Sequence, residues 1–134
     1  MKRNAAAVLA LAAVLVVALA VTAMGRSAQS SKRVTVTMGG SFPNFRFRGV
    51  PKQLKAGTVR FTFRNTSTQP NGVRHNFTVI RTFGQARRFR SATLASGKSQ
   101  SLTVNLRPGV YIAVCTVNNG FHAANRMLTA FTVQ

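Results

Sequence analysis

Residues 110–127 read VYIAVCTVNNGFHAANRM, and this stretch decides what fold the sequence predicts. Its first five residues, Val110 to Val114, are all apolar, which is typical of a central strand that is buried on both faces of a sheet. Cys115 ends that strand, and Asn118-Asn119-Gly120 then supplies the residue types that a tight turn requires. The stretch therefore predicts a buried strand, a folded loop and a return of the chain at Met127.

Other segments alternate between apolar and polar residues with a period of two. Residues 33–38 and 59–64 follow this pattern, which fits half-buried antiparallel strands. Residues 83–94 show neither a strand nor a helix period, so we expect a loop there. Gly, Pro, Asn and Ser residues separate the strands, and their spacing predicts an all-β sandwich. The remaining predicted strands are His75–Thr82, Ser101–Leu106, Val110–Cys115 and Met127–Val133.

The N-terminal residues have the pattern of an export signal. Met1-Lys2-Arg3 precedes an uncharged apolar run from Ala5 to Ala23 that ends in small residues, so we expect residues 1–23 to be a cleaved signal peptide. The run is also close to the roughly 20 residues that cross a bilayer, and an uncleaved membrane-anchor helix formed by residues 5–23 is the alternative. Residues 24–32 are then a linker and residues 33–134 a single domain. In either case we expect this domain to lie outside the cytoplasm, in the periplasm or cell envelope or secreted.

The charged side chains of the protein are all basic. The sequence has 19 Lys and Arg and no Asp or Glu, which gives a formal net charge of +19. Paired-acid glycosidases, Ser-His-Asp triads and oxygen-rich calcium or magnesium sites all need carboxylates and are therefore excluded. A basic chain of this kind suits nucleic acid, but the basic residues are spread along the chain and the export signal argues against that partner. We expect a monomer whose partner is an acidic redox protein or the anionic cell envelope.

The residues that bind transition metals are few, and their order is informative. Two neutral imidazoles and one thiolate, with a thioether as a weak axial ligand, form the donor set of blue-copper sites. A Cys and two His also suit zinc, which is the main alternative metal. Taken singly, the Cys would more often be a small buried hydrophobe and the Met a core residue. The chain has one Cys and two His, and the candidate ligands follow in the order His75, Cys115, His122 and Met127.

Strand parity supports a common site for these residues. Alternate residues of a strand share a face, and His75 and Met127 each share a face with apolar residues of their predicted strands. Seven residue steps separate Cys115 from His122, and an extended chain of that length would reach roughly 23–25 Å. The loop must therefore fold sharply to bring both side chains to one metal ion.

The sequence resembles the cupredoxins, the small blue-copper proteins that include plastocyanin and azurin. The resemblance covers about residues 45–133. It implies a Greek-key β-sandwich of about seven to eight strands with one type 1 copper ion. Six residues between Cys115 and His122 are more than in the small electron carriers, and longer loops occur in relatives such as copper nitrite reductases. The marks of the resemblance are LKAGTV at 54–59, HNF at 75–77, LRPGVY at 106–111, and the residues Cys115, His122 and Met127.

The resemblance also implies roles for neighbours of the ligands. Asn76 and Thr116 occupy positions whose side chains hydrogen-bond around the copper site in many cupredoxins, and a backbone N–H near position 76 is expected to donate to the Cys115 sulfur. His122, beside Phe121, is expected to form the exposed edge through which electrons pass. Because no carboxylate is available, we expect backbone carbonyls or amides such as Asn76 to orient the ligating imidazoles.

Three functions are compatible with these residues. The first is an electron carrier that cycles between Cu(I) and Cu(II), and it is not an enzyme. The second is a copper-binding or delivery module, or a sensor-like domain, that binds copper without redox turnover. The third is a subunit of a copper oxidoreductase, which is disfavoured because two His residues cannot build further copper centres.

Overall fold

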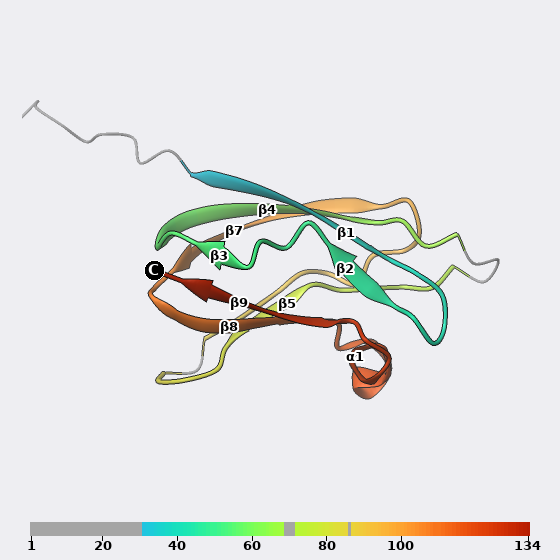
Figure 1. The fold of residues 1–134 in the computed structure, drawn as a ribbon. Coiled ribbons are helices and arrows are strands. Elements are labelled where there is room, and N and C mark those ends of the chain that lie inside the picture. Colours follow the sequence, from blue (N-terminus) through green and yellow to red (C-terminus); the bar gives the residue numbers. More distant parts are fainter. Residues whose placement is uncertain (1–30, 69–71, 86) are drawn as a thin grey trace, which may run out of the picture.

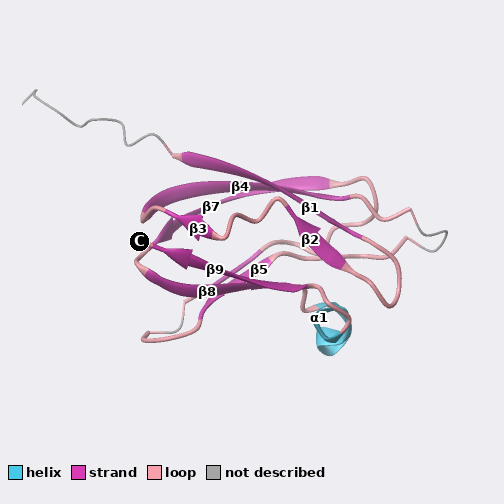
Figure 2. Cartoon of the chain, viewed as in Figure 1, coloured by secondary structure: helices cyan, strands magenta, loops and turns pink. Residues whose placement is uncertain are grey.

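The computed structural model describes residues 31–68, 72–85 and 87–134. The predicted signal peptide or anchor at residues 1–23 lies outside this part of the chain. Two sheets pack face to face in the described part, with strand orders β2-β1-β4-β7 and β3-β9-β8-β5-β6 (Figures 1 and 2). The elements are β1 Lys32–Gly39, β2 Arg46–Arg48, β3 Gln53–Leu54, β4 Gly57–Asn65, β5 Thr78–Arg81, β6 Arg88–Arg90, β7 Ser99–Leu106, β8 Gly109–Val114, the 3₁₀ turn η1 Val117–Gly120, α1 Phe121–Ala124 and β9 Leu128–Val133.

A group of aromatic side chains joins the two sheets. Phe77, just before β5, is fully buried, and its ring lies 5.3 Å from the ring of Phe61 and 5.5 Å from that of Phe63, both in β4. Phe61 in turn lies 6.5 Å from Phe131 in β9. Alternate residues of β4 thus point inward, as the period of two predicts. The predicted all-β sandwich is confirmed.

The pairing of the strands differs in one respect from the prediction. β1 and β4 are parallel, with Val34 opposite Phe61, although their alternation was expected to mark antiparallel strands. Parallel neighbours need a long connection, and residues 40–56 provide it by forming β2 and β3 before the chain returns as β4. Alternation reports which face of a strand is buried and carries no information on strand direction.

Three short strands and one helical turn were not predicted. β2, β3 and β6 have two or three residues each, too few to show a period, and β6 lies in the segment 83–94 that was expected to be a loop. The strand predicted from His75 begins at Thr78, and His75 itself forms an isolated bridge with Leu94. Among the described residues, no helix combines the length and apolar character needed to cross a membrane.

Candidate metal centre

Strand pairing brings the His75 segment next to the Cys115 segment. β5 and β8 are antiparallel neighbours with Thr78 opposite Val114, so the residues just before β5 lie beside those just after β8. His75 is held by two backbone bonds to Leu94, of 3.1 and 2.7 Å. Cys115 directly follows β8, which is the central strand of its sheet, as the apolar run predicts. The expected burial on both faces is wrong, because Val110 is 39% exposed and Ile112 is only half-buried on the outer face.

The loop after Cys115 folds back through residues in the left-handed conformation. Asn118, Asn119 and Gly120 have φ values of 51°, 53° and 87°, which Asn and Gly tolerate better than other residues. The turn predicted at these three residues is therefore present. It leads into α1, a single helical turn that carries His122, and the backbone N–H of Met127 donates to the His122 carbonyl at 2.9 Å.

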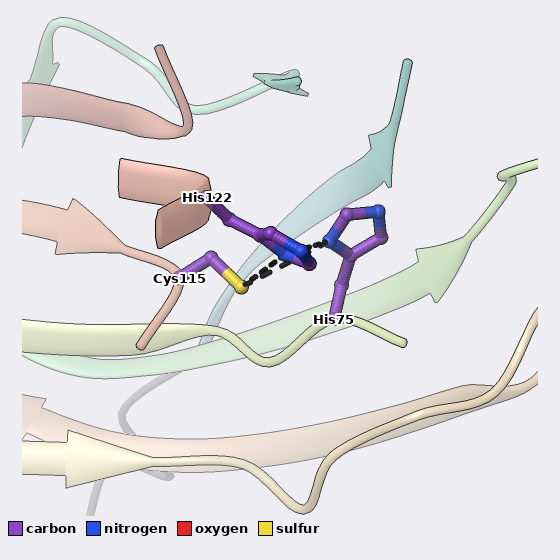
Figure 3. Close-up of side chains that lie close together, drawn as sticks. All are labelled: His75, Cys115 and His122. Carbon is purple, nitrogen blue, oxygen red and sulfur yellow. Dashed lines mark hydrogen bonds between the residues drawn. The ribbon is translucent and has the colours of Figure 1, made fainter. Parts of the chain in front are cut away.

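Figure 3 shows the side chains of His75, Cys115 and His122 pointing toward one another. The two Nδ1 atoms lie 3.1 Å apart, and the Cys115 Sγ lies 3.5 Å from Nδ1 of His122 and 3.9 Å from Nδ1 of His75. His75 and Cys115 are fully buried and His122 is 3% exposed. Ligands that share one transition-metal ion at bond lengths of about 2.0–2.3 Å are separated by distances of this size. The cluster therefore has the spacing of a metal site.

A serine hydroxyl holds the far side of the His75 ring. Ser67 Oγ lies 2.9 Å from Nε2 of His75, and the backbone N–H of Ser67 donates to the Asn65 side chain at 3.0 Å. Asn65 is itself fixed by donating to the carbonyls of Val73 and Leu94. The expectation that a carbonyl or amide orients this imidazole is wrong, because the group at Nε2 is a hydroxyl. No feature of the sequence assigns Asn65 or Ser67 to the site, and the eight-residue separation of Ser67 from His75 becomes meaningful only once the chain has folded.

Asn76 and Thr116 connect the two segments that carry the cluster. The Asn76 amide nitrogen donates to Thr116 Oγ1 at 3.0 Å, and the Thr116 backbone N–H donates to Asn76 Oδ1 at 2.9 Å. The backbone N–H of Asn76 also donates to Cys115 Sγ at 3.5 Å. The resemblance predicted hydrogen bonds by Asn76 and Thr116 around the site and a backbone N–H donated to the Cys115 sulfur, and the structure contains them.

Three phenylalanines lie between the cluster and the surface of the protein. Phe45 is buried, and its ring lies 4.4 Å from the His122 ring and 5.4 Å from the His75 ring. Phe121 is 45% exposed and stacks on Phe42, which is 62% exposed, with ring centroids 5.6 Å apart. The expectation that His122 is the exposed edge is wrong. Successive residues of a helical turn point about 100° apart, so Phe121 faces outward while His122 turns inward onto Phe45.

Met127 is fully buried and tied by its backbone to both neighbouring candidate ligands. Its carbonyl accepts from the backbone N–H of Cys115 at 3.1 Å, and its own N–H donates to the His122 carbonyl. The chain thus returns from α1 to the start of β9 alongside the end of β8. Met127 shares the inward face of that segment with Phe131 and Val133, as parity predicts.

Burial changes the proton affinity of all three cluster residues. Desolvation, reinforced by the nearby His122, lowers the pKa of His75 to about 4, and desolvation also lowers the pKa of His122. Desolvation raises the pKa of the Cys115 thiol against the opposing effects of the Asn76 and Val117 N–H groups and of Arg90. Near neutral pH the metal-free imidazoles are therefore neutral and can donate a lone pair, whereas the thiol must lose its proton when a metal binds.

The fold is shared with solved cupredoxins at low sequence identity. Auracyanin B is 22% identical, with a TM-score of 0.55 over 79% of this chain and 91% of that one. Rusticyanin from Thiobacillus ferrooxidans is 20% identical, with a TM-score of 0.53 over 78% of this chain and 79% of that one. The azurin of Methylomonas sp. strain J is 15% identical, with a TM-score of 0.53 over 78% and 98% of the two chains.

A multicopper oxidase from Pediococcus acidilactici also contains the fold. It is 12% identical, with a TM-score of 0.59 over 79% of this chain but only 27% of that one. No family model and no curated protein matches the sequence. The structural likeness confirms the cupredoxin-like fold predicted from the sequence, and the buried donor set of two imidazoles and one thiol fits a single type 1 copper ion.

Proposed function

We propose that the protein is an exported electron carrier with one copper ion bound by His75, Cys115 and His122 and with Met127 as the axial ligand. The observation that supports this proposal most directly is the cluster itself, whose ligand atoms all lie within 4.8 Å of one another in a buried position. Bound there, copper supplies a one-electron couple between Cu(I) and Cu(II).

The surrounding residues suit electron transfer because they hold the ligands in one arrangement. Ser67 fixes the His75 ring, Phe45 packs on both imidazoles, and the Asn76 N–H donates to the Cys115 sulfur. A hydrogen bond to the sulfur stabilises its negative charge and tunes the potential of the site. A pocket that changes little between two oxidation states favours rapid transfer without bond rearrangement.

The stacked pair Phe42 and Phe121 provides the route to the surface in this proposal. The Phe121 ring lies 6.1 Å from the His122 ring and is partly exposed, whereas the three cluster residues are buried. A partner that docks on α1 therefore approaches the cluster through Phe121. We propose an acidic redox protein as this partner, because the chain has no side-chain carboxylate and a net charge of +19. Export is proposed from the apolar segment at residues 5–23.

An electron carrier is favoured over a copper enzyme by the use of the histidines. Both His residues of the chain lie in the cluster, which leaves none for a second copper centre. Phe45 and α1 also cover the side of the cluster that lies nearest the surface. Among the described residues, the cluster therefore has no open coordination position at which a substrate could bind.

Copper loading of the purified protein tests the proposal. We expect an intense blue absorption band that disappears on reduction and returns on reoxidation. Cys115→Ser should abolish the band while the far-UV circular dichroism stays that of a β-sandwich. A colourless, redox-silent copper complex would contradict the electron-carrier function, and a blue complex that cannot be reduced reversibly would favour the binding or delivery function.

A matched pair of methionine variants tests the axial ligand. Met127 and Met38 are both fully buried, and Leu is close to Met in volume, so both substitutions should preserve the fold. Met127→Leu should shift the absorption spectrum and the reduction potential, whereas Met38→Leu, in β1, should leave both unchanged. Identical spectra for the two variants would remove Met127 from the ligand set. If the purified protein binds zinc in preference to copper, the proposed metal is wrong and zinc takes its place.

A further inference from the structure

The outer face of the four-stranded sheet is covered by arginine and by hydroxyl side chains. Its inner face packs on the core, and strand pairing arranges the outward residues in rows across β1, β4 and β7, with β2 at the edge (Figure 1). Apolar side chains are absent from these rows, and the chain has no Asp or Glu to pair with the arginines. The rows are Arg33, Arg60 and Thr103; Thr35, Thr62 and Ser101; and Arg48, Thr37, Arg64 and Ser99.

A hollow of about 160 Å³ lies at the end of this face, where β1 and β2 meet the chain that follows β4. It is lined by Thr37, Gly39, Gly40, Arg46, Arg48 and Thr66. A water molecule needs roughly 10–15 Å³ of such space, so the hollow can hold a tetrahedral oxyanion together with several waters.

Two glycines that line this hollow have no room for a side chain. A Cβ atom at Gly39 would lie 2.7 Å from Thr66 Oγ1, and one at Gly40 would collide with the Asn44 carbonyl. Gly40 also has a φ of 100°, a conformation that favours glycine. The Thr66 hydroxyl donates to the Met38 carbonyl at 3.2 Å, which fixes Thr66 as a wall of the hollow.

The charged groups at the hollow suit a divalent oxyanion. Arg46 and Arg48 are two residues apart in β2, so both side chains project from the same face, about 6.6 Å apart at their Cα atoms. Thr37 lies directly opposite Arg48 and supplies a hydroxyl between that arginine and Arg64. Guanidinium groups bind phosphate oxygens in pairs, and two like charges placed side by side are relieved by an anion between them.

We propose that Arg46, Arg48 and Thr37 form a binding site for a phosphate-type oxyanion on the outer face of the sheet. The site is separate from the metal cluster, because Thr37 points to the opposite side of β1 from the buried Val36 and Met38. The phosphate group can belong to a small soluble molecule or to a lipid headgroup of the cell envelope. The proposal does not depend on the bound metal.

Calorimetric titration of the full chain with inorganic phosphate, in neutral detergent at constant ionic strength, tests the site. We expect saturable binding that Arg46→Gln/Arg48→Gln weakens at least about tenfold and Thr37→Val weakens severalfold. The matched control is Arg33→Gln/Arg60→Gln, which removes the same charge from the same face away from the hollow and should weaken binding less than about twofold. Thermal unfolding of each variant verifies that it is folded.

The source of the phosphate group is distinguished with vesicles. Phosphatidylcholine vesicles measure the background that the apolar N-terminal segment causes, and vesicles that also contain phosphatidate present a phosphate monoester at a surface. Additional binding to phosphatidate that depends on Arg46 and Arg48 would assign the site to a lipid headgroup, and phosphate binding without this gain would assign it to a soluble ligand. Equal losses in the two double variants, or phosphate binding that never saturates, would overturn the proposal.

Discussion

Replacing Asn76 with alanine should destabilise the metal-free protein by about 3–5 kcal/mol. The Asn76 side chain is fully buried and makes two short hydrogen bonds to Thr116, one with its amide nitrogen and one with its oxygen, besides a longer bond of 3.4 Å from the Thr116 hydroxyl. Each such bond contributes about 1 kcal/mol net, and the Thr116 backbone N–H, left without its partner in a partly buried position, costs about 1–3 kcal/mol more. Because these bonds join the His75 and Cys115 segments, the loss should also loosen the cluster.

Urea denaturation of the metal-free variants measures this effect. Thr116→Val removes the hydroxyl and leaves the buried Asn76 amide nitrogen without this acceptor, but it keeps the backbone N–H that donates to Asn76, so it should cost somewhat less, about 2–4 kcal/mol. Asn105→Ala, on the exposed face of β7, is the matched control and should change the free energy of unfolding by less than about 0.5 kcal/mol. If Asn76→Ala costs no more than Asn105→Ala, the two hydrogen bonds do not hold the segments together and the reasoning fails.

Three further changes follow from the site. Ser67→Ala removes the hydroxyl at Nε2 of His75 and should lower copper affinity about 10- to 100-fold in a chelator competition, while Ser101→Ala on the outer face of β7 should have no effect. Gly120→Ala should destabilise the protein by about 1–2 kcal/mol in thermal unfolding, because its φ of 87° is unfavourable for alanine, and an unchanged midpoint would argue against this turn. The metal-free protein should lose up to about 3 kcal/mol of stability between pH 6.5 and pH 4, because the pKa of His75 is about 4 in the folded protein and the unfolded chain takes up the proton first. His75→Gln should flatten this part of the plot of stability against pH. An equally steep plot for both proteins would contradict the lowered pKa of His75.

The longest strands were predicted because they show a period of two, whereas β8 was predicted from its apolar run. β1, β4 and β7 each have eight or nine residues with apolar side chains at alternate positions. β2 and β6 both read Arg-Phe-Arg and are stabilised only as edge strands by a neighbour, which no local pattern reveals. The direction of the β1 and β4 pair likewise depends on the path of the whole connection between them and is not encoded locally.

The candidate site could be predicted as far as residue chemistry and order allow. His75, Cys115 and His122 are rare residue types in this chain, so their grouping was apparent before the fold was known. Ser67 and Phe45 are common residue types that gain a role only through tertiary contact, and they could not be found in this way. The inward turn of His122 also escaped prediction, because it depends on one helical turn that is too short to show a period.

The parallel pairing of β3 with β9 joins parts of the chain that are made far apart in time during synthesis. The backbone N–H of Thr132 donates to the carbonyl of Lys52, 80 residues earlier, and His75 lies 40 and 47 positions before the other two cluster residues. Closing contacts of such long range is slow and needs nearly the entire chain. If the chain is exported as proposed and crosses the membrane in extended form, it carries its candidate ligands separated, and the compartment in which it folds supplies the metal.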